Sequence, residues 1–133
     1  MSPTGLHHEH RVARRFDARA ALVALASAQE RHFLRYTRYA DRLAPETTAA
    51  GPRGGGGDAD VEGTLTSPAV SPQAHYALAI GAVADEDYRL EARPRGVQAR
   101  DTECVLFVLE RSGLRSARDA AGRDTTRRCW AGA

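Results

Sequence analysis

The sequence predicts an α+β fold in which one long N-terminal helix packs on an antiparallel β-meander of three to four strands. Two observations carry this prediction. Apolar residues recur at helical spacing in the first third of the chain and at every second position in the last part, and a Gly- and Pro-rich stretch separates the two. The length of 133 residues suits one domain. We expect residues 1–10 to be a leader or an expression-derived segment, and residues 11–133 to form the domain.

The helix is expected over residues 11–39, which contain neither Gly nor Pro and are rich in strong helix formers. An apolar stripe at helical spacing should face the core, and it consists of Leu22, Leu25, Ala26, Gln29, Phe33 and Tyr36. Polar residues should occupy the other faces, among them Asp17, Arg19, Glu30, Arg31 and, on the surface, His32. A helix with one apolar stripe needs a sheet or a second helix to cover it.

Residues 40–74 are expected to form one long variable loop without regular structure. This stretch holds most of the prolines and the run "GPRGGGGDAD". A loop of this length in a small domain is usually functional or mobile.

Residues 75–133 are expected to form the sheet and a C-terminal region. "HYALAIGA" and "DYRLEARP" alternate, so Tyr76 and Leu78 should share one face with Tyr88 and Leu90. The run "ECVLFVLE" is apolar on both faces and should be covered on both sides. A turn at Ser112–Gly113 should lead to a weaker, Arg-decorated strand.

Cys104 and Cys129 are the only two cysteines in the chain. A redox pair, half of a metal site and a disulfide are the three alternatives. The spacing is not CxxC, and two cysteines with distant histidines make a poor zinc site, so we favour a disulfide. Such a bond indicates an oxidising compartment. Closing a loop of about 25 residues would stabilise the fold by roughly 3.5 kcal/mol in the chain-entropy model.

Arginine supplies all 19 basic residues, and the formal net charge is only +2. Codon usage in a GC-rich genome explains the absence of Lys, yet every cation can then make planar, bidentate contacts to phosphate. The densest group lies near the C-terminus, with three more arginines just before it. It consists of Arg111, Arg115, Arg118, Arg123, Arg127 and Arg128, preceded by Arg93, Arg95 and Arg100. These side chains are candidates for a stripe that contacts DNA phosphates. The alternative is an ordinary solvated surface with local Asp partners.

No catalytic or cofactor-binding pattern is present, so we expect neither enzymatic activity nor a cofactor. "RGGGG" lacks the Lys-Ser/Thr of a phosphate-binding loop and is interpreted as a flexible loop. His7, His8 and His10 resemble a metal tract but have no carboxylate or Cys cluster beside them. Acidic residues without calcium-loop spacing are interpreted as solvated charges, and these are Asp58, Asp60, Glu62, Asp85, Glu86 and Asp87. We expect no metal site.

Five stretches, in this order and spacing, resemble a type IV pilin, and most closely the PilE-like minor pilins. They are "ARAALVALASAQERHFLRYTRYA" at 18–40, "YALAI" at 76–80, "YRLEARPRGVQARDTEC" at 88–104, "LERSGL" at 109–114 and "CW" at 129–130. The resemblance implies a long helix, a variable loop, a meander and a disulfide-closed C-terminal loop. The family also begins with a leader, a cleavage site and an apolar membrane helix, which this sequence lacks. The resemblance therefore implies a soluble headpiece of a truncated pilin.

The resemblance implies a structural minor pilin that is incorporated into type IV pili or primes their assembly, with roles in twitching motility, adhesion or DNA uptake. Its partners would be other pilin subunits, and its place the bacterial cell surface. The full-length precursor would be anchored in the inner membrane and face the periplasm, whereas the headpiece alone should be monomeric. One alternative is a DNA-receptor minor pilin that uses the arginines above. Another is a type II secretion pseudopilin, which the C-terminal disulfide loop disfavours.

Overall fold

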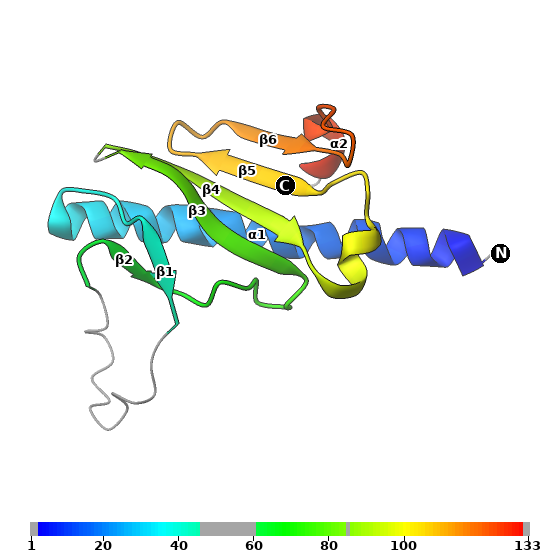
Figure 1. The fold of residues 1–133 in the computed structure, drawn as a ribbon, viewed down its shortest axis with the longest axis horizontal. Coiled ribbons are helices and arrows are strands. Elements are labelled where there is room, and N and C mark those ends of the chain that lie inside the picture. The colour runs from blue at the N-terminus through cyan, green and yellow to red at the C-terminus, as the bar shows by residue number, and fades with distance from the viewer. Residues whose placement is uncertain (1–2, 46–60, 85, 132–133) are drawn as a thin grey trace, which may run out of the picture.

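The computed structural model describes residues 3–45, 61–84 and 86–131, and it has the predicted α+β fold (Figure 1). The long helix α1 (Pro3–Tyr36) lies across one face of a four-stranded sheet. The strands are β3 (Tyr76–Ala84), β4 (Asp87–Pro94), β5 (Leu106–Glu110) and β6 (Arg115–Arg118), in that spatial order. Each neighbouring pair is antiparallel, which confirms the meander. A 3-10 helix, η3 (Gly96–Arg100), joins β4 to β5, and a short helix, α2 (Thr126–Cys129), follows β6.

The helix α1 spans Pro3–Tyr36, so the expected limits of 11 and 39 were both wrong. The start was missed because residues 3–10 are polar and show no apolar period. Proline is well tolerated in the first turn, where its missing N–H would have no partner anyway. The helix ends because Thr37 adopts a left-handed conformation with φ of 56°. Its N–H donates to the carbonyl of Phe33 at 2.8 Å and closes the last turn.

The expected irregular loop over 40–74 is also corrected, because it contains two short strands. They are β1 (Arg42–Ala44) and β2 (Thr64–Thr66), which pair in parallel with Leu43 opposite Leu65. Leu65 is buried, so this small sheet joins the core. The Gly-rich run, with Asp58 and Asp60, lies outside the described residues.

The core lies between α1 and the inner face of the sheet. The helix contributes Ala18, Ala21, Leu22 and Leu25, and the strands contribute Tyr76, Leu78, Tyr88, Leu90, Ala92, Phe107, Leu109 and Ala117. The rings of Tyr76 and Phe107 meet edge to face, with centroids 5.5 Å apart. Phe107 and Val108, on opposite faces of β5, are both buried as the sequence predicted.

The predicted apolar stripe of α1 is correct at its centre and wrong at its end. Leu22 and Leu25 are buried, and Phe33 packs against the core. Tyr36 lies outside the core cluster, with its ring centroid 4.6 Å from that of His32. The stripe fails there because the helix ends at this residue and the chain turns back.

Two polar residues of α1 that were expected on the surface are buried. Asp17 is only 3% exposed, and its carboxylate accepts hydrogen bonds from the hydroxyl of Ser71 and from the backbone N–H groups of Gln73 and His75. His32 is 4% exposed, and its Nε2 accepts from the N–H of Gly63 at 3.1 Å. Both side chains therefore fasten a loop to the helix, which is why burial does not penalise them.

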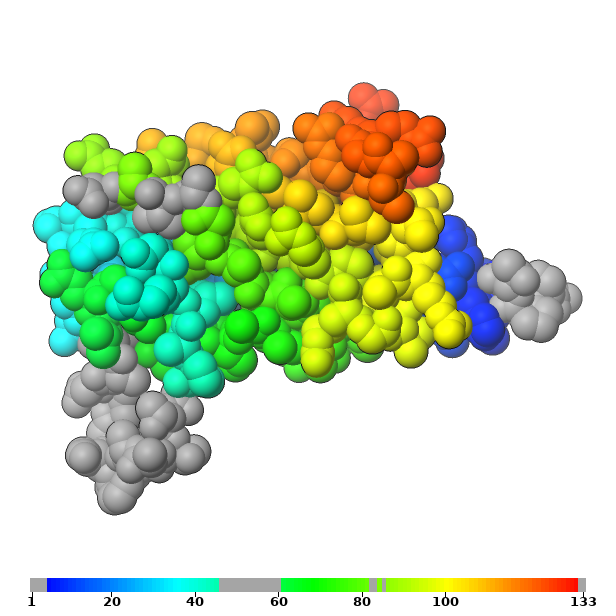
Figure 2. All heavy atoms as spheres, in the orientation of Figure 1, coloured from blue at the N-terminus to red at the C-terminus, as the bar shows by residue number. Residues whose placement is uncertain are grey.

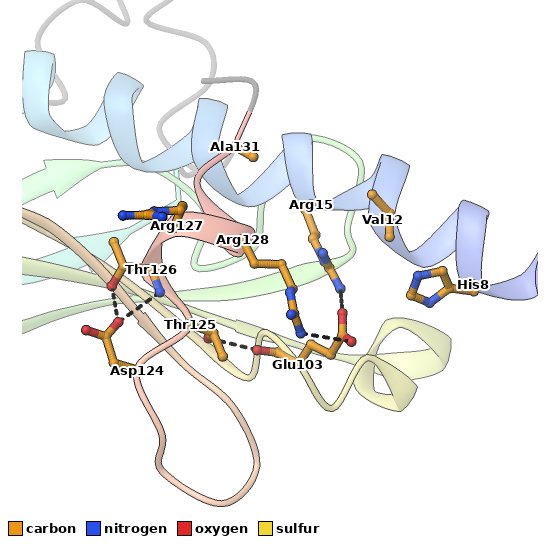
Figure 3. A pocket seen from close by; sticks show the side chains of 10 residues that line it. All are labelled: His8, Val12, Arg15, Glu103, Asp124, Thr125, Thr126, Arg127, Arg128 and Ala131. Carbon is orange, nitrogen blue, oxygen red and sulfur yellow. Dashed lines mark hydrogen bonds and ion pairs between the residues drawn. The ribbon is translucent and has the colours of Figure 1, made fainter.

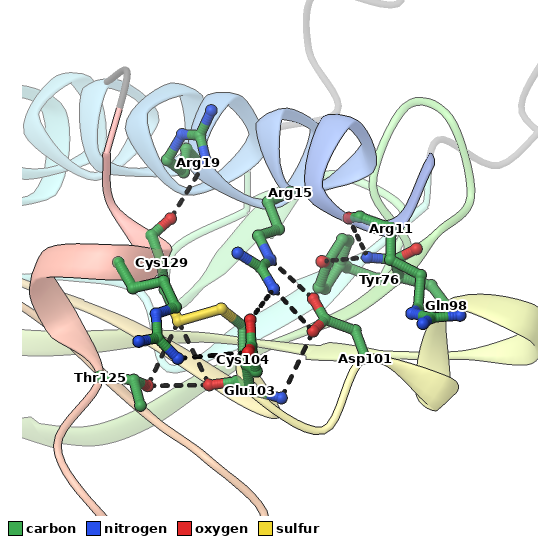
Figure 4. Close-up of polar contacts among 11 residues, drawn as sticks. Arg11, Arg15, Arg19, Tyr76, Gln98, Asp101, Glu103, Cys104, Thr125 and Cys129 are labelled. Atoms are coloured by element: carbon green, nitrogen blue, oxygen red, sulfur yellow. Dashed lines mark hydrogen bonds and ion pairs between the residues drawn. A yellow bond between two sulfur atoms is a disulfide. The ribbon is translucent and has the colours of Figure 1, made fainter. Parts of the chain in front are cut away.

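A buried arginine joins α1 to the segment between η3 and β5 (Figure 4). Arg15 donates two hydrogen bonds to Asp101, at 2.8 and 2.9 Å, and a third to Glu103 at 2.9 Å. Burial disfavours the charged guanidinium, but the bonds to Asp101 and Glu103 outweigh it and raise the pKa of Arg15 above its ordinary value. The bond from Arg15 also lowers the pKa of Glu103, with a smaller contribution from the charge of Arg128.

Cys104 and Cys129 form the predicted disulfide, which ties α2 to the start of β5 (Figure 4). Both cysteines are fully buried. In the described part of the chain, no helix combines the length and apolarity needed to cross a membrane.

Removing the disulfide should loosen the C-terminal region before the rest of the domain. We expect the double change Cys104→Ser and Cys129→Ser to lower the free energy of unfolding by about 3.5 kcal/mol, because the open chain regains loop entropy. Hydrogen exchange should then accelerate first over residues 112–130, whose polar turn has little apolar burial, and last in α1. Uniform acceleration across the domain would contradict this order.

The interaction of Glu103 with Arg15 should make the free energy of unfolding depend on pH in the acidic range. The folded-state pKa of Glu103 lies below its ordinary value of 4.5, so the unfolded chain binds the extra proton first. The stabilisation is complete above the ordinary pKa and is lost as pH falls through the folded-state pKa. Thermal unfolding from pH 7 to 3 should therefore show Glu103→Gln as less stable than the wild type at pH 7, with a difference that shrinks in acid.

The matched control for this measurement is Glu86→Gln, which removes the charge of an exposed carboxylate that has no ion pair within the described residues. This variant should follow the wild-type pH dependence. If Glu103→Gln also ran parallel to the wild type throughout, the contact with Arg15 would contribute nothing to stability.

Candidate nucleic-acid interface

The C-terminal segment, residues 115–131, packs along one edge of the sheet (Figure 2, orange to red). Besides the disulfide, the indole Nε1 of Trp130 donates to the carbonyl of Ser116 at 2.9 Å, and its ring meets Phe107 edge to face. From α1, Arg19 donates to the carbonyl of Cys129 at 3.1 Å. A polar segment is thus held in one conformation, which fixes where its arginines point.

The two aspartates of the C-terminal segment bind their own loop. Asp119 accepts hydrogen bonds from the N–H groups of Arg123 and Ala121, each at 2.9 Å, and the bond from Arg123 is the main reason that its pKa is lowered. Asp124 accepts from the hydroxyl and N–H of Thr126, and these bonds lower its pKa as well. The guanidinium of Arg123 also pairs with Asp119 at 3.1 Å, so this arginine is partly neutralised.

Arg127 and Arg128 on α2 differ in their partners. Arg128 forms an ion pair with Glu103 at 3.2 Å, whereas Arg127 is exposed and forms no hydrogen bond or ion pair within the described residues. Both line an open groove of about 1210 Å³ between α2, Glu103 and the first turns of α1 (Figure 3). The groove is lined by His8, Val12, Arg15, Glu103, Asp124, Thr125, Thr126, Arg127, Arg128 and Ala131.

Arg115 and Arg118 are the arginines of β6. The guanidinium of Arg115 lies over the ring of Trp130, 5.0 Å from its centroid. Arg118 donates to the carbonyl of Gly122 at 3.4 Å and pairs across the strand with Leu106, on the face of the sheet that points away from α1. Both are exposed and have donors left for a ligand.

Arg93 and Arg95 lie at the end of β4 and directly after it, at the same end of the sheet as α2 (Figure 1). The side chain of Arg93 is 55% exposed and pairs with Glu91 at 2.8 Å. Arg95 donates to the carbonyl of Ala74 at 3.0 Å. Because Ala92 lies opposite Phe107 and Leu106 opposite Arg118, the sheet register lets Arg93 contribute to a basic surface next to Arg118.

Arg111 lies in the turn next to Arg115, which pairs with Leu109, but it has a carboxylate partner of its own. It follows β5 in the turn at the opposite end of the sheet and lies 3.7 Å from Asp87. Of the nine predicted arginines, five thus belong to the C-terminal segment, whereas Arg93 and Arg95 lie on or after β4, Arg100 on η3 and Arg111 in the β5–β6 turn. That they form one DNA-binding stripe stays a prediction.

Sequence reasoning missed the role of Glu103, which anchors both Arg15 and Arg128. A signal was available, because Glu103 and Arg128 each precede a bridged cysteine and the disulfide brings their neighbours together. Within residues 3–45, 61–84 and 86–131, no group of three or more His, Cys, Asp or Glu side chains is placed to hold a metal ion.

Residues 7–108 of the chain match the protein family described as type IV minor pilin ComP, DNA uptake sequence receptor. The structure is also similar to that of a type IV pilin from Shewanella oneidensis, with a TM-score of 0.50 and 24% sequence identity over 79% of this chain and 89% of that one. At this identity the likeness supports the fold alone. No curated protein matches the sequence.

The family match spans well over half of the 133 residues. It favours a minor pilin over a type II secretion pseudopilin, and it implies a place in the extracellular pilus of a bacterium. Pilins are structural, non-enzymatic proteins. From the match and the fold together, this chain belongs to the ComP family of type IV minor pilins.

Proposed function

We propose that this chain is a subunit of type IV pili that binds DNA through the arginines of its C-terminal segment. The observation that carries the proposal is Arg127, an exposed guanidinium that forms no ion pair with the described residues and lies on a disulfide-anchored helix. The description of the family as a DNA uptake sequence receptor supports the same ligand. In this proposal, incorporation into the filament presents the segment to DNA outside the cell.

The balance of charge in the C-terminal segment favours a polyanion. Five guanidinium groups of the segment face its two carboxylates and that of the neighbouring Glu103, and the two within the segment are held by backbone N–H groups of their own loop. The arginines are Arg115, Arg118, Arg123, Arg127 and Arg128, and the carboxylates are Glu103, Asp119 and Asp124. Phosphate contacts of this kind supply most of the sequence-independent affinity for DNA.

The contacts of these arginines also limit the side-chain conformational entropy that is lost when DNA binds. Arg115 is already oriented by the ring of Trp130, and Arg128 by Glu103. Long side chains that are ordered before binding lose less freedom on contact with a ligand. Arginine suits phosphate binding better than lysine, because its planar guanidinium group makes two parallel hydrogen bonds to one phosphate.

The filament contact in this proposal is made by the outer face of α1. Four apolar side chains at helical spacing remain 39–84% exposed, on the helix face opposite to the buried Leu22 and Leu25, and they are Val12, Phe16, Val23 and Leu34. Exposed apolar stripes on a soluble domain mark contact surfaces. A neighbouring pilin subunit is the proposed cover. The stripe is narrow and interrupted by Arg19 and Glu30, so the isolated domain is proposed to be monomeric.

In the same proposal, the precursor is anchored in the inner membrane with this domain in the periplasm. That compartment is oxidising, so the Cys104–Cys129 bond can form before assembly. Roles in twitching motility or adhesion would follow from incorporation into the pilus and need no further site on this domain.

Arg127→Ala should weaken DNA binding and reduce its dependence on salt. Removing one phosphate contact should lower the slope of log K against log salt concentration by about one. Equilibrium binding to a short duplex between 50 and 200 mM salt measures this slope. Arg127 is preferred to Arg128, because Arg128→Ala would also leave Glu103 without one of its two partners.

The control for the binding experiment is Arg31→Ala, which removes an equal charge from the exposed side of α1 far from α2. It should leave both the affinity and the slope close to the wild-type values. Equal effects of the two variants would indicate a general charge effect, and absence of wild-type binding at physiological salt would end the receptor proposal.

Phe16→Ser should reduce the incorporation of the protein into pili, because it removes a large apolar group from the proposed subunit contact. The side chain is 58% exposed, so the domain itself should keep its stability. Immunoblots of sheared pili from the producing cell provide the measurement. The matched control is Leu114→Ser, at a residue 60% exposed in the β5–β6 turn. Equal incorporation of both variants would argue against the stripe as the contact.

A further inference from the structure

A second basic site lies between α1 and η3, apart from the groove beside α2. It is a cleft of about 260 Å³, and its lining consists of His7, His10, Arg11, Arg14, Val97 and Arg100. The four residues from α1 follow the spacing i, i+3, i+4, i+7, so they share one face of the helix. Five of the six lining side chains carry nitrogen donors, and none is a carboxylate.

The walls of the cleft are held together by Gln98, which is 1% exposed (Figure 4). Its amide nitrogen donates to the carbonyl of Arg11 at 2.9 Å and to the hydroxyl of Tyr76 at 2.9 Å. Burial, only partly offset by the bond from Gln98, raises the pKa of Tyr76 to about 12, so this hydroxyl remains neutral at physiological pH. Val97 and Arg100 flank Gln98 on η3, and their positions relative to α1 are thereby fixed.

The charges of the cleft are uncompensated within the described chain. Arg11, Arg14 and Arg100 form no ion pair there, in contrast to Arg15 one residue further along the helix. Asp101 directly follows Arg100, but its carboxylate is buried and occupied by both bonds from Arg15. Like charges gathered in a concavity repel one another and concentrate anions from solution.

We propose that this cleft binds a phosphate group. Three guanidinium groups with two imidazoles offer more donors than a carboxylate, with two oxygens, can use, whereas a phosphate presents at least three acceptor oxygens. The small volume suits one such group rather than a nucleotide base. The group is either free phosphate or part of a nucleic-acid backbone, and the chemistry of the contact is the same. The site does not depend on the DNA surface proposed for α2.

The test is a titration with inorganic phosphate against chloride at constant ionic strength, followed through the arginine Nε–H signals in ¹⁵N NMR spectra. We expect saturable shifts of Arg11, Arg14 and Arg100. The double change Arg14→Ala and Arg100→Ala should weaken phosphate binding about tenfold or more, because charge-assisted bonds are lost. Arg31→Ala, near the other end of α1, should leave phosphate binding unchanged. Absence of saturable binding, or binding that the double variant retains, would overturn the proposal.

A second titration with a short DNA duplex distinguishes the two sources. Shifts of Arg14 and Arg100 on addition of DNA, with weaker DNA binding by the double variant, would identify the backbone phosphate as the ligand. Shifts by inorganic phosphate alone would identify a separate small-anion site. Both results support a phosphate site, and neither requires that DNA binds at Arg127, so the two proposals fail independently.

Discussion

The buried contact of Arg15 with Asp101 is the constraint on which the functional end of the molecule depends. Both side chains are 3% exposed, so removing either partner would leave an uncompensated charge in the core. The contact sets the position of α1 against the segment between η3 and β5. Glu103 and Cys104 follow directly, and through them the position of α2 is set. The position of the arginines on α2 therefore depends on the Arg15–Asp101 ion pair, which lies on the opposite side of the groove.

Elsewhere along α1, other buried polar side chains also bind loops to the helix. Asp17 binds the loop before β3, Gln29 exchanges two hydrogen bonds of 2.8 Å with the backbone of Ala40, and His32 binds Gly63. Apolar contacts are not directional, so they would let short loops settle in several positions. Hydrogen bonds inside a low-dielectric core select one arrangement, because leaving any of these groups unsatisfied is costly.

Periodicity made the helix, the meander and the apolar faces predictable, and the disulfide followed from the small number of cysteines. The buried polar residues were not predictable, because hydropathy does not reveal a partner that lies far away in sequence. Asp17 meets residues more than 50 positions later. The same limit affected the arginines: Arg111 and Arg115 lie at the same, turn end of the β5–β6 pair, yet Arg111 lies beside Asp87 and Arg115 over the ring of Trp130. Only the fold decides which charges share a surface.

The small net charge of +2 conceals an uneven distribution of ion pairs among the arginines. Arg89, Arg93 and Arg111 on the sheet each lie beside a carboxylate. By contrast, Arg11, Arg14, Arg100 and Arg127 are among the arginines that form no ion pair in the described chain, and they lie on the first turns of α1, on η3 and on α2. Because exposed charges act only over about 10 Å at moderate salt, an anion approaching these residues meets a positive field that the net charge does not describe. The uneven distribution of charge, rather than the total charge, is thus the property on which both proposed anion sites rest.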